Sequence, residues 1–287
     1  MRLTFKNDIG SITMGGGDHP SVNIIEAIGF GLPGKEFSNV TYAGQSGHTT
    51  TNVRDVARTI TLSGTFVGDK KEILKMYNIL YSPGVLIYQD KGVKRQITCR
   101  LTNNDDFKPQ GKSGIYTFAL QFSADDPYFT DTEDLKFDIY KRVDKVTGTI
   151  YNSTGEKVVF TERTTEISVI NSGVKAVYPV IIVQSKELSG IDNTQLEISV
   201  ERDDLVCAII KLNCNTPSND SITFDLPRRR IVSRSQGDIT NYISDETILS
   251  EFYLLPGNNI VKFDAHDGVG KVTAELMYRN KYAAISL

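Results

Sequence analysis

The alternation of polar and apolar residues in the segment 59–66 limits the fold of this chain more than any other feature. Ile60, Leu62 and Phe66 recur on one side of an extended backbone, while threonine and serine occupy most of the other side. A period of two residues is typical of a half-buried β-strand. The same period returns at 115–122. The sequence therefore predicts a mainly β fold.

One short helix is predicted directly after the first of these strands. Asp69 can cap the helix with its side chain, and Glu72 stands where a capping box needs its second residue. Ile73, Tyr77 and Leu80 then fall on one helical face, which predicts a helix that packs on the sheet.

The second half of the chain is predicted to consist almost entirely of short strands. An apolar run at 180–183 and alternating residues at 196–200 and 272–276 are separated by turn signals, and the alternation slips in phase at 260–263. This spacing is typical of a β-sandwich. We expect no helix longer than a turn or two in this half, and the best candidate is 241–251.

The length of 287 residues favours two domains over one, because single cores stop growing near this size. The charged segment from Asp131 to about Lys145 holds few core residues, and we place the boundary within it. We expect two β-sandwich domains, at 1–135 and 146–287, with the helix packed on the first.

A long polar segment at 41–52 is rich in glycine, serine and threonine and is too long for a plain connection. It is predicted to be an exposed arm or a loop that contacts a partner. Tyr42, Gln45, His48 and Arg54 are the candidate contact residues of this region.

Residues that could carry catalysis are few and scattered. The three histidines, His19, His48 and His266, all lie in glycine-rich or turn-like segments. A catalytic triad needs a serine presented on a sharp turn, and the sequence has no Gly-x-Ser-x-Gly motif. We expect these histidines to be exposed loop residues and the chain not to be an enzyme.

The segment 264–268 is the strongest candidate for a metal site, since it contains Asp264, His266 and Asp267. A calcium ion needs six to eight oxygen ligands, and the EF-hand loop pattern is absent. Asp267 followed by glycine is also a strong hairpin signal. We favour the turn, and we expect neither a metal nor another cofactor.

The cysteines and the charge balance exclude further classes. Cys99, Cys207 and Cys214 are odd in number and scattered, so no disulfide framework or zinc site is expected, and Cys99 is predicted to be a core residue. The net charge of −3 argues against general nucleic-acid affinity. The N-terminus lacks the apolar region of a signal peptide, and no apolar run approaches 18 residues, so membrane insertion is not expected.

Arg228, Arg229 and Arg230 form the basic run that follows Pro227. The run is too short and isolated for a nucleic-acid patch. It is typical of a solvated strand edge, where charges oppose aggregation. Salt bridges to a neighbouring subunit or tail protein are a further interpretation, so all three arginines are candidate contact residues.

The order of these elements resembles that of phage distal tail proteins. A strand, a capped helix, a hairpin and a further strand lead to the closing Asp-Pro-Tyr-Phe at 126–129. The second half adds Asn-Ser-Gly at 171–173 before a strand that starts after Pro179, a Leu-Pro-Gly-Asn-Asn-Ile run at 255–260, and Tyr-Arg-Asn-Lys-Tyr at 278–282. The resemblance covers nearly the whole chain.

The resemblance implies a structural protein of the virion tail tip, in a long-tailed phage or a tail-like bacteriocin, assembled in the host cytoplasm. Six copies would form a ring through tail-tube-like N-terminal domains. One face of the ring would meet the tail tube protein, and the other would carry the tail-tip hub and receptor-binding proteins or fibres. DNA would be cargo that passes through the channel. The C-terminal domain would be galectin-like or similar to a carbohydrate-binding module.

A carbohydrate-binding module for attachment to the host cell wall is the alternative function, with the second half as the active part. Sugar sites usually stack a ring on an aromatic face, and the chain has no tryptophan, although it has 13 tyrosines and 13 phenylalanines. A wall-degrading hydrolase is a third and less favoured interpretation.

Overall fold

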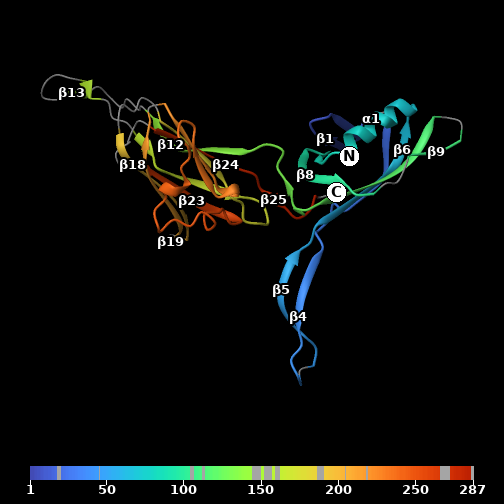
Figure 1. Cartoon of the computed structure of the whole chain (residues 1–287), viewed down its shortest axis with the longest axis horizontal. Helices are drawn as coiled ribbons and strands as arrows, with labels where there is room; N and C mark the ends of the chain where they lie inside the picture. Colours follow the sequence, from blue (N-terminus) through green and yellow to red (C-terminus); the bar gives the residue numbers. More distant parts are fainter. Residues whose placement is uncertain are drawn as a thin grey trace. The chain divides into compact units, whose positions relative to one another are not determined.

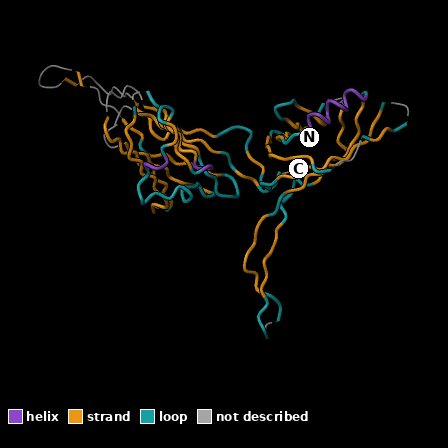
Figure 2. The backbone as a smooth tube through the Cα atoms, in the orientation of Figure 1, coloured by secondary structure: helices purple, strands orange, loops and turns teal. Residues whose placement is uncertain are grey.

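Strands make up most of the chain, and helical turns are few (Figures 1 and 2). The computed structural model describes residues 1–17, 21–44, 46–103, 107–111, 114–143, 150–151, 157–158, 162–185, 191–203, 205–217, 219–265 and 272–285. The chain divides into unit 1, Met1–Thr132 together with the segment from Lys281, and unit 2, Glu133–Asn280. The predicted mainly β fold is confirmed.

Unit 1 is built on one sheet with the strand order β2-β1-β7-β8-β10-β6-β3. Its elements are β1 (Arg2–Lys6), β2 (Ser11–Gly15), β3 (Val22–Ile28), β4 (Lys35–Val40), β5 (Thr49–Asp55), β6 (Arg58–Val67), α1 (Lys70–Leu80), β7 (Gly84–Asp90), β8 (Val93–Leu101), β9 (Lys108–Pro109), β10 (Ile115–Ala124), β11 (Phe129–Thr130) and β25 (Lys281–Tyr282).

The sheet of unit 1 folds back on itself around a core. Only two register pairs, Phe122 with Leu101 and Ser123 with Arg100, join β10 to β8. The two halves of the sheet therefore face each other, and the rings of Phe5 and Phe122 meet across the core with centroids 5.4 Å apart. Ile60, Leu62 and Phe66 are buried, as their alternation predicts.

The helix α1 begins as the sequence predicts. The Asp69 carboxylate accepts a hydrogen bond from the Glu72 backbone N–H at 2.9 Å, and the Glu72 carboxylate accepts one from the Asp69 N–H at 3.0 Å. Ile73, Met76 and Leu80 are the buried residues of the helix. The predicted Tyr77 is partly buried, and its hydroxyl accepts a hydrogen bond from the Phe107 N–H. A satisfied cap and one apolar face thus fix the helix to the sheet.

Unit 2 is a β-sandwich of two sheets, with the strand orders β15-β12-β24-β17-β20-β21-β22 and β16-β23-β18-β19. Its elements are β12 (Leu135–Val143), β13 (Ile150–Tyr151), β14 (Lys157–Val158), β15 (Glu162–Thr164), β16 (Glu166–Asn171), β17 (Val180–Ser185), β18 (Ile191–Arg202), β19 (Leu205–Thr216), β20 (Ser221–Asp225), η1 (Leu226–Arg228), β21 (Arg230–Ser233), β22 (Gly237–Asp238), η2 (Thr240–Tyr242), β23 (Gly257–Ala265) and β24 (Val272–Tyr278).

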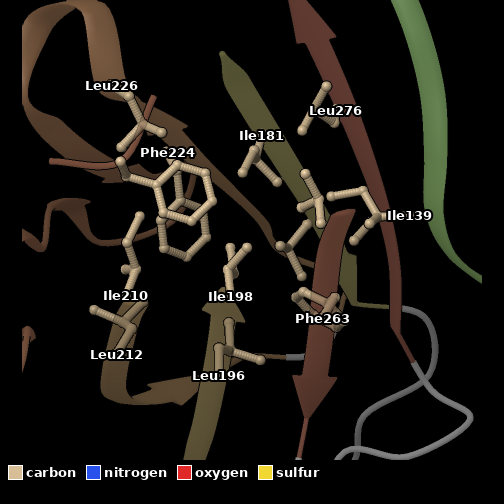
Figure 3. Close-up of a cluster of buried hydrophobic side chains, with 14 of the residues drawn as sticks. Ile139, Ile181, Leu196, Ile198, Ile210, Leu212, Phe224, Leu226, Phe263 and Leu276 are labelled. Atoms are coloured by element: carbon tan, nitrogen blue, oxygen red, sulfur yellow. The ribbon is translucent and has the colours of Figure 1, made fainter. Parts of the chain in front are cut away.

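The core of unit 2 lies between these two sheets (Figure 3). Ile181 and Leu276 enter it from one sheet, and Leu196, Ile198 and Phe263 enter it from the other. All five side chains are at most 1% exposed. Outward-facing residues alternate with these positions along each strand.

The C-terminal segment belongs to unit 1 rather than to unit 2. β25 pairs with β11 through Phe129 with Tyr282 and Thr130 with Lys281, and the Ile285 side chain lies in the core of unit 1. Unit 2 is thus inserted into unit 1 between Thr132 and Lys281. The predicted first domain, 1–135, ends three residues after Thr132. The predicted second domain, 146–287, includes the segment from Lys281, because strand patterns alone do not show which sheet a terminal strand joins.

Among the described residues of unit 2 no helix is longer than one turn, as expected, and the best helix candidate, 241–251, is wrong. Only Thr240–Tyr242 forms a single 3-10 turn. The Ser244 N–H instead donates to the Lys211 carbonyl at 3.0 Å, and the Lys211 N–H donates to the Thr247 hydroxyl at 2.9 Å. The segment is not helical because its polar groups form hydrogen bonds with the backbone at the edge of β19.

The phase slip predicted at 260–263 is also wrong. Asn259, Val261, Phe263 and Ala265 are buried in unbroken alternation, and Ile260 lies on the other side of β23. The amide of Asn259 accepts hydrogen bonds from the Arg202 guanidinium and the Leu255 N–H, and donates to the carbonyls of Leu255 and Gly257. A fully satisfied amide therefore takes the core position that the apolar pattern assigned to isoleucine.

Candidate partner-contact surfaces

The strands β4 and β5 form a hairpin that pairs with no other described strand. We call residues 35–55 the arm, and Figure 1 shows it extending away from the rest of unit 1. Every described residue from Gly34 to Arg54 is exposed. The prediction of an exposed segment at 41–52 is confirmed, and the arm is longer than that segment.

The two faces of the arm differ in chemistry. Phe37 and Val53 are register partners, with exposed fractions of 54% and 47%. On the other face, the Arg54 guanidinium donates to the Glu36 carboxylate at 2.6 Å. An isolated two-stranded hairpin has marginal stability in water. The arm thus exposes an apolar pair without support from any other described strand.

The structure places the candidate residues of the arm as follows. Tyr42 and His48 are exposed near its tip, and Tyr42 is 60% exposed. Arg54 lies on β5 and is paired with Glu36 within the arm. Gln45 lies outside the described residues. Sequence reasoning missed Phe37 and Val53, because the segments 35–40 and 49–55 hold too few apolar residues to show the alternation of a strand.

The root of the arm is held by a buried arginine that sequence reasoning also missed. Arg58 is 3% exposed, and its guanidinium donates to the carbonyls of Pro127, Gly29, Gly31 and Ala283 at 2.5–2.7 Å. The guanidinium also lies over the Phe129 ring, 4.6 Å from its centroid. Burial lowers the pKa of Arg58 from its ordinary value. One side chain thus joins the start of β6 to the chain that precedes the arm, to the turn before β11 and to the C-terminal segment.

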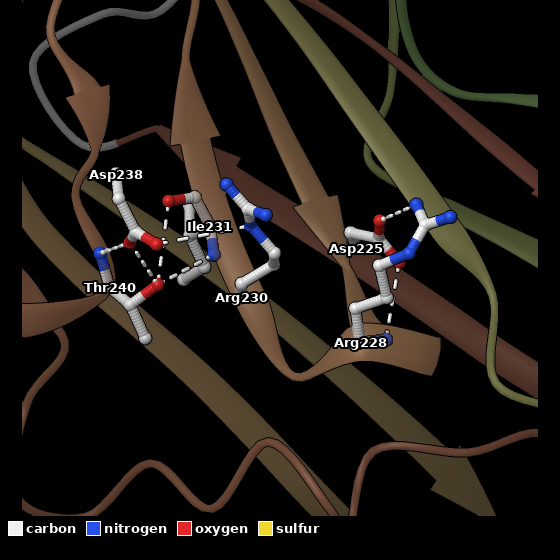
Figure 4. A network of polar contacts seen from close by, with 6 residues as sticks. All are labelled: Asp225, Arg228, Arg230, Ile231, Asp238 and Thr240. Atoms are coloured by element: carbon white, nitrogen blue, oxygen red, sulfur yellow. Dashed lines mark hydrogen bonds and ion pairs between the residues drawn. The ribbon is translucent and has the colours of Figure 1, made fainter.

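The basic run at 228–230 is largely occupied by contacts within the chain (Figure 4). The Arg228 guanidinium donates to the Asp225 carboxylate at 2.8 Å, and the Arg230 guanidinium lies 3.8 Å from Asp238. Arg229 is exposed, adopts a left-handed backbone conformation with φ 54°, and makes no ion pair with any described residue. Arg228 and Arg230 are therefore surface charges of unit 2 that are paired within the chain.

Asp238 shows how this surface is locally ordered. The Thr240 N–H and hydroxyl both donate to the Asp238 carboxylate, at 3.0 and 2.6 Å, and the Thr240 hydroxyl accepts from the Ile231 N–H (Figure 4). The hydrogen bonds from Thr240, together with the nearby charge of Arg230, lower the pKa of Asp238. Such a network fixes the chain between β21 and η2.

The candidate metal-ligating and catalytic residues do not gather in the part of the chain that the structure describes. No group of three or more histidine, cysteine or acidic side chains there could hold a metal ion. His48 is exposed, while His19 and His266, with the candidate Asp267, lie outside the described residues. Cys99 is buried as predicted, and burial raises the pKa of its thiol to about 12. No described helix is both long and apolar enough to cross a membrane.

Residues 20–124 match the family model of the phage tail protein RIFT-related domain. This match includes the whole arm and α1. It confirms the predicted resemblance to phage tail proteins. No curated protein matches the sequence.

Solved structures share the fold of nearly the whole chain. The SPP1 Dit protein (gp 19.1), described as a paradigm of the hub adsorption apparatus of phages that infect Gram-positive bacteria, is similar with a TM-score of 0.62 and 16% identity, over 89% of this chain and 92% of that one. Chains of the phage p2 baseplate in its activated conformation, with Sr and with Ca, give TM-scores of 0.53 and 0.56 at 11% identity. They cover 96% and 99% of this chain, and 97% and 99% of their own.

Proposed function

We propose that this chain is a structural distal tail protein whose first unit assembles into a ring of six copies between the tail tube and the tail tip. The observation that carries this proposal is the arm, a ribbon of exposed residues that lies within the region matching the phage tail family. The fold shared with SPP1 Dit and the p2 baseplate chains supports the same role. The role is one of assembly, without catalysis.

The arm would bind a neighbouring copy through its apolar pair. Burial of the exposed surface of Phe37 and Val53 supplies a favourable free energy of roughly 25 cal/mol per Å² of apolar surface. The Glu36–Arg54 pair would remain at the rim of the contact, where a charge pair contributes little to affinity. In a closed ring, the arm of every copy would make the same contact with its neighbour.

The further partners follow from the predicted family. One face of the ring would bind the tail tube protein, and the other the tail-tip hub and the receptor-binding protein or fibre. Unit 2 would be a galectin-like or carbohydrate-binding-module-like sandwich. Tyr42, Gln45, His48 and the arginines at 228–230 stay proposed contacts. The net charge of −3 suits a channel that DNA passes through without binding.

Size-exclusion chromatography with light scattering, followed by negative-stain electron microscopy, tests the ring. We expect a species with six times the mass of one chain and a central opening. The double variant Phe37→Ser/Val53→Ser should weaken association about tenfold or more, because it removes the apolar pair of the arm.

Leu74→Ser is the matched control, since Leu74 is 62% exposed on α1 and lies outside the arm. It should leave the ring intact. A strict monomer at high concentration, with no ring in the micrographs, would overturn the proposed assembly. Specific retention of that monomer on host cell walls would instead support the carbohydrate-binding alternative.

A further inference from the structure

The arm meets the rest of unit 1 at its root. Among the described strands β4 and β5 pair only with each other, and every described residue from Gly34 to Arg54 is exposed. Asp55, the last residue of β5, is half-buried, and its carboxylate accepts a hydrogen bond from the Tyr128 hydroxyl. We call this hydrogen bond the root contact.

Tyr128 is held in place by its neighbours in the Asp-Pro-Tyr-Phe segment. Its backbone N–H donates to the Asp126 carboxylate at 3.3 Å. The Lys281 ammonium lies 2.6 Å from the same carboxylate and 6.0 Å from the centroid of the Tyr128 ring. The next residue, Phe129, stacks its ring on that of Phe30 in the core of unit 1. The tyrosine hydroxyl is therefore presented to the arm from a fixed turn.

Arg58 connects the chain on both sides of the arm to the same segment. Its guanidinium donates to the carbonyl of Pro127, directly before Tyr128, at 2.6 Å. It also donates to the carbonyls of Gly29 and Gly31, which lie on the chain before the arm. These bonds hold the base of the arm, while the root contact reaches a residue of the arm itself.

A small rotation at the root has a large effect at the far end of the arm. A strand rises by about 3.3 Å per residue, so β4 is roughly 20 Å long, and a rotation of about 15° would move its far end by roughly 5 Å. That displacement is close to the spacing of neighbouring strands in a sheet. Exposed residues near the tip, such as Tyr42 and His48, would then lose their place on a partner surface.

We propose that the root contact fixes the direction of the arm, and that this direction determines whether copies of the chain close into a ring. The second part rests on the proposed function. In a head-to-tail assembly, the contact sets the rotation between neighbouring copies, and a rotation that does not close gives an open filament. Tyr128 and Asp55 are thus positioning residues, while the exposed residues of the arm make the contact itself.

A distance measurement tests the direction of the arm without a ring. Spin labels are placed at Val40→Cys and Lys71→Cys in the double variant of the arm that lacks its apolar pair, and Cys207→Ser removes the exposed native thiol. Double electron–electron resonance should give one narrow distance peak. Adding Tyr128→Phe should widen that peak about twofold or more, because the ring stays and the hydroxyl donor is lost.

Two substitutions of Asp55 separate the hydrogen bond from the charge. Asp55→Ala should widen the distance peak as Tyr128→Phe does, because the acceptor is lost. Asp55→Asn should keep the peak narrow, because the amide oxygen can still accept the Tyr128 hydroxyl. Tyr242→Phe is the matched control, since Tyr242 is 48% exposed in unit 2, and it should leave the peak unchanged.

Electron microscopy of the otherwise native chain tests ring closure. Tyr128→Phe should replace rings of one size with mixed sizes and open filaments, while the midpoint of thermal unfolding changes little. A distance peak that Tyr128→Phe leaves unchanged would overturn the root contact, and uniform rings of that variant would overturn its effect on closure. A native chain that forms no ring would overturn the proposed function together with the closure step, and the distance measurement would still decide the root contact.

Discussion

Asp220 is a buried carboxylate that the fold keeps charged through neutral donors. It is 4% exposed, and its oxygens accept hydrogen bonds from the backbone N–H groups of Ser221 and Ser235 and from the hydroxyls of Ser233 and Ser235. Burial alone would raise its pKa, but these hydrogen bonds together hold the pKa of Asp220 below its ordinary value. The carboxylate thereby connects β20 to the chain after β21.

This arrangement predicts an acid-dependent loss of stability in unit 2. A carboxyl group with a lowered folded pKa stabilises the fold fully above its unfolded pKa of about 4, and the contribution disappears as pH falls through the folded pKa. Asp220→Asn should lower the free energy of unfolding by about 1–2 kcal/mol at pH 7, and by less below pH of about 4. Urea unfolding followed by circular dichroism measures both.

Asp245→Asn is the control for that prediction, because Asp245 is exposed and the substitution makes the same change in charge. A stability difference between Asp220→Asn and the native chain that stays constant at every pH would contradict the role given to the charge.

At the scale of elements, the Asp69–Glu72 capping box fixes where α1 begins, and three buried apolar residues hold the helix on the sheet. Asp69→Ala removes the capping box and should cost about 1 kcal/mol of stability, seen as a lower midpoint of thermal unfolding. Asp69→Asn should cost much less, because asparagine can still accept the Glu72 N–H. An equal loss in both variants would show that the charge, and not the cap, is what matters.

The elements also show how far the sequence could predict this fold. Strict alternation located β6 and β10, and the Asp69–Glu72 spacing located α1, because each depends on local chemistry. Asn259 defeated the same reasoning, since its amide oxygen is satisfied in part by Arg202, which is distant in the sequence and reaches it only after the sandwich has formed. Arg58 was missed for the same reason, as its four carbonyl partners come from three distant segments.

The arm was predictable in part. Its glycine, serine and threonine content indicated exposure, but its strand pairing was hidden because neither strand has a buried face.

At the scale of the whole molecule, the chain leaves unit 1 after β11 and returns to pair with the same strand as β25. The return is held by several contacts. Arg95 lies over the Tyr282 ring, 3.9 Å from its centroid, the Ile285 N–H donates to the Phe30 carbonyl at 3.0 Å, and Lys281 pairs with Asp126. Residues 281–285 therefore complete the core to which β1 also contributes.

This topology predicts which unit a C-terminal substitution will destabilise. Ile285→Ala should lower the stability of unit 1 by about 2–4 kcal/mol, because Ile285 is 4% exposed in that core. Hydrogen exchange should show faster exchange in β1 and β7 and unchanged exchange in β17 and β20. Ile181→Ala, in the core of unit 2, should give the reverse pattern. Faster exchange in β17 after Ile285→Ala would contradict the assignment.

The pairing of β11 with β25 also has a consequence for how such a protein can diversify. Thr130 and Lys281 are register partners, so the two points where unit 2 is spliced into the chain begin from adjacent positions on one ribbon. Any domain with neighbouring termini can replace the insert without disturbing the arm or the first core. A lineage could then exchange unit 2 as a cassette and keep unit 1 unchanged.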